Sequence, residues 1–90
     1  MGTLEKCRSA FVETAVDDEI VIICLDSGRF FSIKGTGLAV WHMIDRGASR
    51  GQILAGLADR FDAAPEVLAR DVELFLGDAR RAGLIREVPE

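Results

Sequence analysis

The sequence IVIICLDSGRFFSI, residues 20–33, decides the fold, because it contains two β-rich segments and the turn that joins them. Residues Ile20–Leu25 are all apolar and mostly β-branched, which is typical of a buried strand. Asp26-Ser27-Gly28 provides turn residues, and Gly28 can adopt a positive φ angle. Arg29–Ile33 follows as a second strand, so the two strands are predicted to pair as an antiparallel hairpin.

A third strand precedes this hairpin. Phe11–Val16 is extended by composition, and Asp17-Asp18 supplies the turn that leads into Ile20–Leu25. Two tight connections predict an antiparallel sheet of three consecutive strands. Because side chains alternate along a strand, Phe31 and Ile33 are predicted to share one face of the sheet, and Phe30 and Ser32 the other.

The hydrophobic period changes to a helical one after Lys34-Gly35. Thr36 is predicted as the N-cap of a first helix that ends before Gly47 and packs Val40, Trp41 and Ile44 inward. Ser49 and Gln52 form a capping-box pattern that starts a second helix. The core side of this second helix is predicted to hold Ile53, Leu54, Leu57, Ala58 and Phe61.

A third helix is predicted from Pro65, which suits a first helical position, toward Gly83. Its core stripe consists of Leu68, Val72, Phe75, Leu76 and Ala79, and Leu84 and Ile85 then return the chain to the core. Three strands followed by three helices predict an α+β fold with a winged-helix-like arrangement. Residues 1–90 form one domain in this interpretation, with a core from about residue 11 to residue 85.

The composition is that of one small acidic domain. Of the 90 residues, 49% are hydrophobic, and fifteen acidic side chains exceed eleven basic ones for a net charge of −4. Nucleic-acid binding relies on basic side chains, so this balance argues against a nucleic-acid partner. The longest apolar run has six residues, far short of the roughly 20 that span a membrane, and the N-terminus lacks a signal-peptide pattern. We therefore expect a cytoplasmic protein with no membrane partner, with Cys7 and Cys24 as reduced thiols.

The sequence offers no recognisable catalytic or metal-binding motif. Its single histidine, His42, has no motif partner and is expected to be structural or exposed. Cys7, Cys24 and His42 are too far apart in sequence for a zinc site, which needs about four closely spaced ligands. Gly35-Thr36-Gly37 lacks the rest of a P-loop or dinucleotide motif and is interpreted as a helix entry. We expect a protein that is not an enzyme and that uses no cofactor or metal.

Two features point instead to a binding groove. Beside its core stripe, the third helix has a second stripe formed by Val67, Asp71, Leu74 and Asp78. The strand Arg29–Ile33 lies at the end of the sheet, and its centre lacks the lysine, proline or bulge that protects most strand edges. An open edge can accept a peptide strand, with the helix as the opposite wall. The alternatives are a wide core-facing helix and a short edge that this helix covers.

The sequence resembles the PqqD family of precursor-peptide recognition elements across residues 11–85. The similar segments are Asp26–Ile33, Thr36-Gly37, Trp41, Leu57–Asp62, Pro65-Glu66, Asp71-Val72 and Gly83–Ile85. The resemblance implies a winged-helix-like fold that binds the leader segment of a ribosomally synthesised precursor peptide. In that family, the leader adds a strand to the third strand, in the cleft beside the third helix. Transferred to this sequence, the peptide-binding residues are Arg29, Phe30, Phe31, Ser32, Ile33, Val67, Asp71, Leu74 and Asp78.

Within this family, the sequence looks most like the stand-alone leader-binding proteins of lasso-peptide clusters, which work with a leader peptidase and a cyclase. The alternative pathway is that of a PqqD-type chaperone for a radical enzyme, as in pyrroloquinoline quinone synthesis. Two other classes remain: a winged-helix DNA-binding protein and a protein-interaction module that binds no leader. The third helix has a net charge of −1 from Glu66 to Arg81, which argues against DNA. Lys34 and Ala64 depart from the family's usual asparagine and helix-capping residue.

The middle strand is apolar on both faces, although helices can cover only one face of a three-stranded sheet. Ile20, Ile22 and Cys24 alternate along it with Val21, Ile23 and Leu25. We predict that the face away from the helices is covered by the N-terminal segment or docks a partner enzyme.

Overall fold

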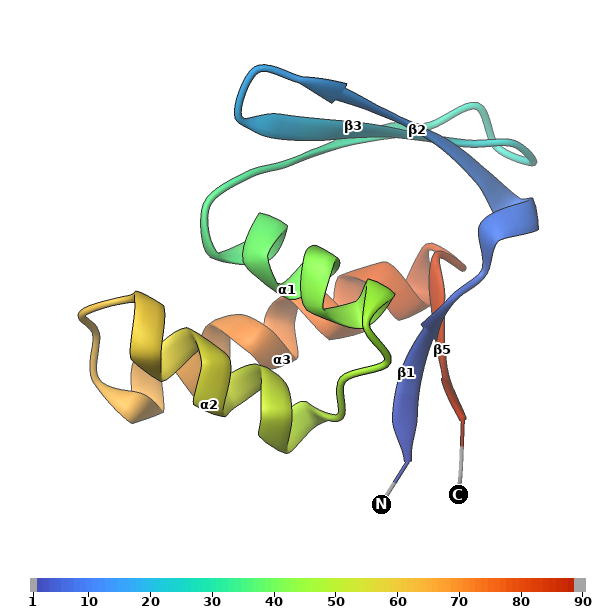
Figure 1. Ribbon diagram of the computed structural model, residues 1–90. Coiled ribbons are helices and arrows are strands. Elements are labelled where there is room, and N and C mark those ends of the chain that lie inside the picture. Colours follow the sequence, from blue (N-terminus) through green and yellow to red (C-terminus); the bar gives the residue numbers. More distant parts are fainter. Residues whose placement is uncertain (1, 89–90) are drawn as a thin grey trace.

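The computed structural model describes residues 2–88 and, within them, contains two sheets and three helices (Figure 1). The elements follow in the order β1 (Thr3–Lys6), the 3₁₀ turn η1 (Arg8–Ala10), β2 (Phe11–Val16), β3 (Glu19–Cys24), β4 (Phe30–Ile33), α1 (Thr36–Asp45), α2 (Arg50–Arg60), α3 (Pro65–Arg81) and β5 (Ile85–Val88). Strands β2, β3 and β4 form a layer on one side of the helices. The predicted α+β, winged-helix-like arrangement of three strands and three helices is confirmed.

The three-stranded sheet is antiparallel in the order β2-β3-β4, as predicted. Its register aligns Glu13, Ile22 and Phe31 across the three strands on the helix-facing side. The strand boundaries differ slightly from the prediction, because β3 ends at Cys24 and Arg29 precedes β4. A hydrogen bond from the Gly28 N–H to the Cys24 carbonyl, at 2.9 Å, closes the turn and sets these boundaries.

The helix ends follow the capping chemistry of the sequence, with one exception. Helix α2 begins with the predicted capping box, in which the Gln52 N–H donates to Ser49 Oγ at 3.2 Å and the Ser49 N–H donates to Gln52 Oε1 at 2.8 Å. Pro65 is the first residue of α3. The prediction of Thr36 as an N-cap is wrong, because Gly35 caps α1 with a φ angle of 63°. Glycine adopts that conformation without strain, so Thr36 becomes the first helical residue.

The core lies between the three-stranded sheet and the helices, with Trp41 of α1 at its centre. Trp41 is fully buried, and its ring lies 5.5 Å from that of Phe11 between centroids. Its indole N–H donates to a carboxylate oxygen of Glu13 at 2.9 Å. Most of the predicted helical core positions are buried, but Leu54, Phe61 and Phe75 are only partly buried and Ala58 is exposed.

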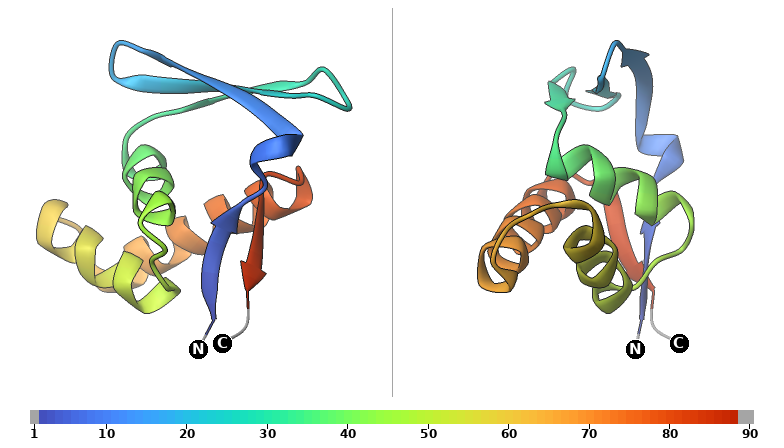
Figure 2. Two further views of the ribbon diagram at one scale, coloured as in Figure 1. Left: turned by 45° about the vertical axis from the view of Figure 1, so that its right-hand side comes forward. Right: turned by 60° about the vertical axis from the view of Figure 1, so that its left-hand side comes forward.

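A second, two-stranded sheet formed by β1 and β5 was not predicted. The two strands pair antiparallel, with Leu4 opposite Glu87 and Lys6 opposite Ile85. Leu4 and Ile85 are buried, so the core extends toward the N-terminus beyond the predicted limit near residue 11. Figure 2 shows β1 and β5 side by side, away from the three-stranded sheet. The prediction that the N-terminal segment covers the far face of that sheet is therefore wrong, because the segment pairs with β5 instead.

Among residues 2–88, no helix combines the length and the apolar character needed to cross a membrane.

Candidate functional site

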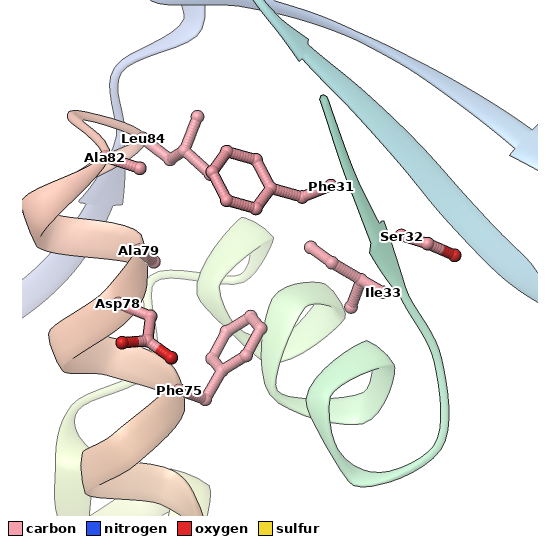
Figure 3. Close-up of a pocket in the computed structure, with 8 residues that line it drawn as sticks. All are labelled: Phe31, Ser32, Ile33, Phe75, Asp78, Ala79, Ala82 and Leu84. Atoms are coloured by element: carbon pink, nitrogen blue, oxygen red, sulfur yellow. The ribbon is translucent and has the colours of Figure 1, made fainter. Parts of the chain in front are cut away.

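A cleft runs along α3, with β4 opposite the helix at one pocket (Figure 3) and the start of α1 opposite it at a second pocket. The first pocket has a volume of about 180 Å³ and is lined by Phe31, Ser32, Ile33, Phe75, Asp78, Ala79, Ala82 and Leu84. The second pocket, of about 280 Å³, is lined by Lys34, Thr36, Gly37, Val40, Asp71, Leu74 and Phe75. Phe75 lines both pockets, so the two pockets meet at this side chain on α3.

The strand side of the cleft presents an unpaired backbone edge. Strand β4 is the last in the order β2-β3-β4, and no described strand pairs with its other side. The Cys24 N–H donates to the Arg29 carbonyl at 2.8 Å, so Arg29 turns its backbone groups toward β3. In an antiparallel ladder, every second residue of a strand does the same. By that alternation, Phe31 and Ile33 direct their N–H and C=O groups toward β3. Phe30 and Ser32 direct theirs toward the cleft edge.

The side chains of β4 alternate in the opposite sense to these backbone groups. Phe31 and Ile33 point toward α3, whereas the hydroxyl of Ser32 points away from it (Figure 3). Phe31 and Ile33 therefore make an apolar floor beside an edge whose hydrogen-bonding groups come from their neighbours. This is the geometry that an added strand needs: backbone donors and acceptors along one line, and pockets for alternate side chains.

The helix side of the cleft combines small, aromatic and acidic residues. Ala79 and Ala82 leave room beside Leu84, and Asp78 at the rim is paired with Arg81. Phe75 was predicted to belong to the core stripe, but it lies at the border of that stripe and its ring points into the cleft. The buried stripe of α3 is narrower than predicted and consists of Leu68, Val72, Leu76 and Ala79.

The structure brings most of the predicted site residues together. Phe31, Ser32, Ile33 and Asp78 line the first pocket, and Asp71 and Leu74 line the second. The side chains of the other three predicted site residues lie outside these two pockets. Arg29 lines a neighbouring pocket with Arg81 and Asp26, Phe30 is 72% exposed on the far face of the sheet, and Val67 lines neither pocket of the cleft.

Several cleft residues escaped the sequence analysis. They are Phe75, Ala79, Ala82 and Leu84 in the first pocket and Lys34, Gly37 and Val40 in the second. Ala79 near the end of α3 and Ala82, its C-cap, could have been found as two small residues three positions apart, and such residues leave a hollow on a helix surface. Gly37 gives no such signal, because its role depends on a contact with Phe75, 38 positions away in the sequence.

The described part of the chain shows no metal-binding constellation. Among residues 2–88, no group of three or more His, Cys, Asp or Glu side chains could hold a metal ion. His42 is exposed, and Cys7 and Cys24 are free thiols, the latter buried in the core. The cleft offers apolar contact and backbone hydrogen bonding, which is the chemistry of binding an extended peptide.

Comparison with known proteins shows that the fold occurs elsewhere. Two solved structures share the fold over nearly the whole chain. The structure of TbiB1 in complex with the TbiA(beta) leader peptide is 21% identical, with a TM-score of 0.82, and the alignment covers 96% of this chain and 99% of that one. The structure of lasso peptide synthetase B1 complexed with the leader peptide is 14% identical, with a TM-score of 0.81 and coverage of 92% and 96%. No curated protein matches the sequence.

The family model of coenzyme PQQ synthesis protein D (PqqD) matches residues 19–85, which include β3, β4, all three helices and the whole cleft. This protein therefore belongs to the PqqD family.

Proposed function

We propose that this protein binds the leader segment of a ribosomally synthesised precursor peptide, which adds to β4 as a further strand in the cleft beside α3. The observation that carries this proposal is the unpaired edge of β4 beside a pocket that β4 and α3 line together. The two solved structures with the same fold both contain a leader peptide, which supports the same kind of ligand here.

The two sides of the cleft have separate roles in this binding. The N–H and C=O groups of Phe30 and Ser32 supply hydrogen bonds that any peptide backbone can make, so they contribute affinity. The pockets around Phe75 receive alternate side chains of the peptide, so they contribute specificity. The protein acts by binding and presentation, without catalysis and without a cofactor.

The similar solved structures support one pathway in particular. We propose that the bound leader is presented to the maturation enzymes of a lasso-peptide pathway, a leader peptidase and a cyclase, in the cytoplasm. The similarity to lasso peptide synthetase B1 supports this pathway. A second candidate is a chaperone role beside a radical enzyme in coenzyme PQQ synthesis, which the family's description favours.

The proposal is tested by Ser32→Pro, which removes the N–H that points toward the cleft edge. Proline is tolerated on an edge strand where the N–H faces outward, so the fold should survive. Leader binding should weaken at least about tenfold, because one backbone hydrogen bond is lost and the proline ring obstructs the incoming strand. The measurement is a fluorescence-anisotropy titration with the leader of the precursor peptide encoded beside the gene.

Ala15→Pro is the matched control on the opposite edge of the sheet. The Leu25 N–H donates to the Ala10 carbonyl at 3.0 Å, so alternation directs the Ala15 N–H away from β3 as well. This substitution should leave leader binding unchanged within about twofold. Equal losses for the two prolines, or no loss for Ser32→Pro, would contradict strand addition at β4.

A further inference from the structure

Gly37 lies in the first turn of α1, and the packing around it explains why glycine occupies this position. It does not adopt a positive φ angle, so its backbone would accept alanine. A Cβ atom at this position would lie 3.2 Å from Cδ1 and 3.3 Å from Cε1 of Phe75, and 3.5 Å from Cγ2 of Ile33. The space that the missing side chain leaves is occupied by the Phe75 ring.

The Phe75 ring is bounded by the core on one side and by the cleft on the other. It meets Trp41 edge-on, with centroids 6.5 Å apart and an interplanar angle of 80°. Trp41 is fully buried and has no space to move away from the ring, whereas the other side of the Phe75 ring borders the pockets of the cleft. A group added at Gly37 would therefore displace the ring in the direction that has free volume, which is into the cleft.

We propose that Gly37 and Phe75 together determine which peptide side chain the cleft accepts. Because Gly37 lets the ring lie against α1, the first pocket is deep enough for a large apolar side chain, aliphatic or aromatic, of the bound peptide. Phe31, Ile33, Ala79 and Leu84 supply the apolar lining for that side chain. Phe75 is the specificity-determining residue and Gly37 positions it; this inference rests on the proposed peptide binding.

The test uses substitutions of graded size at Gly37 together with a compensating change at Phe75. Gly37→Ala should move the ring by a small amount, and Gly37→Val should move it further. Phe75→Leu replaces the rigid ring, Cε1 included, by a shorter side chain that can turn away from residue 37. The double variant Gly37→Val/Phe75→Leu should therefore recover the lost depth of the first pocket. Thermal melting establishes whether each variant folds. If Gly37→Val does not fold, Gly37→Ala/Phe75→Leu provides the same comparison.

The probe is a displayed library of random peptides about twelve residues long, enough to span α3, whose 17 residues extend about 26 Å. Wild-type protein should select peptides with a large apolar residue at one position, and the strongest binder is then titrated against every variant. Its affinity should fall about threefold with Gly37→Ala and more than about tenfold with Gly37→Val. The double variant should restore it to within about threefold. Gly37→Val should itself select smaller residues at that position.

The possible failures separate this inference from the proposed function. If the wild-type protein selects no peptide and binds no leader, peptide binding itself is wrong, and this inference fails with it. If wild type selects peptides but the folded Gly37 variants bind the strongest one equally well, only the inference about Gly37 is overturned. It is also overturned if binding is lost and Phe75→Leu does not restore it, because Gly37 would then act through another contact.

Discussion

Leu74 and Phe75 are adjacent on α3 and differ in what surrounds them. Leu74 is 59% exposed at the wall of the second pocket, beside Asp71. Phe75 is partly buried, contacts Trp41 and lines both pockets of the cleft. A charge at Leu74 should therefore affect binding alone, whereas Phe75→Glu should reduce both binding and stability.

Leu74→Glu is predicted to weaken leader binding at least about tenfold without lowering the melting temperature. Burying a leucine side chain contributes about 1.5–3 kcal/mol, and about 1.4 kcal/mol corresponds to a tenfold change in affinity. Val67→Glu is the matched control, since Val67 is 43% exposed on the same helix but lines neither pocket. The prediction fails if Leu74→Glu unfolds the domain, or if both glutamates weaken binding equally.

At the level of elements, the far face of the three-stranded sheet is an exposed apolar surface. Val12, Ile23 and Phe30 stand in register across β2, β3 and β4, and Val16 and Leu25 are exposed as well. Figures 1 and 2 show this face on the side of the sheet opposite the helices. Since β1 pairs with β5, the remaining half of the original prediction is that a maturation enzyme docks here.

The double substitution Val12→Thr/Ile23→Thr tests that docking. Threonine is β-branched and suits an exposed strand position, so stability should change by less than about 0.5 kcal/mol per site. Both residues lie outside β4, so leader affinity should stay the same. If a leader peptidase is the docked enzyme, as proposed, its removal of the leader should slow by about tenfold, because two apolar contacts are lost. Unchanged processing, or a change in sedimentation that shows self-association through this face, would rule out enzyme docking.

At the scale of the whole molecule, an ion pair joins the two-stranded sheet to the helical layer. Lys6 of β1 is buried, with its Nζ 2.8 Å from Oδ2 of Asp45 at the end of α1 and 4.0 Å from the centroid of the Trp41 ring. Arg8 pairs with the same carboxylate. Partial burial acts to raise the pKa of Asp45, but the hydrogen bonds and charges of Lys6 and Arg8 outweigh it and lower the pKa.

This lowered pKa predicts how stability depends on pH. A carboxyl whose pKa is lower in the folded state contributes stability above its ordinary pKa, and that contribution is lost as pH falls through the folded pKa. Asp45→Asn should cost about 1–3 kcal/mol near neutral pH, because Lys6 remains buried without its partner charge. The difference in melting temperature between wild type and variant should shrink as the pH is lowered below about 4. A difference that is constant with pH would contradict this role of the ion pair.

The sequence predicted those parts of the fold that depend on local patterns of residues. β-Rich composition and turn residues predicted the three consecutive strands, and helix-start residues such as Ser49 and Pro65 predicted where helices begin. The sequence analysis missed β1 and β5, because each strand has only four residues and paired residues such as Glu5 and Arg86 are about eighty positions apart in the sequence. The predicted groove lies between β4 and α3, where the structure has a pocket, but the side chains of Phe30 and Val67 line neither pocket of the cleft. Whether a side chain faces a pocket depends on the register and on helix rotation, which periodicity fixes only approximately.

Strand addition at β4 is tested most directly by amide hydrogen exchange of the full chain, resolved by residue, with and without the leader peptide. The N–H groups of Phe30 and Ser32 point toward the cleft edge, so their exchange should slow markedly when the leader binds. The Ala15 N–H, on the opposite edge of the same sheet, should exchange at an unchanged rate. Protection of Ala15, or of β1 and β5, with Phe30 and Ser32 unaffected would show that the peptide binds elsewhere.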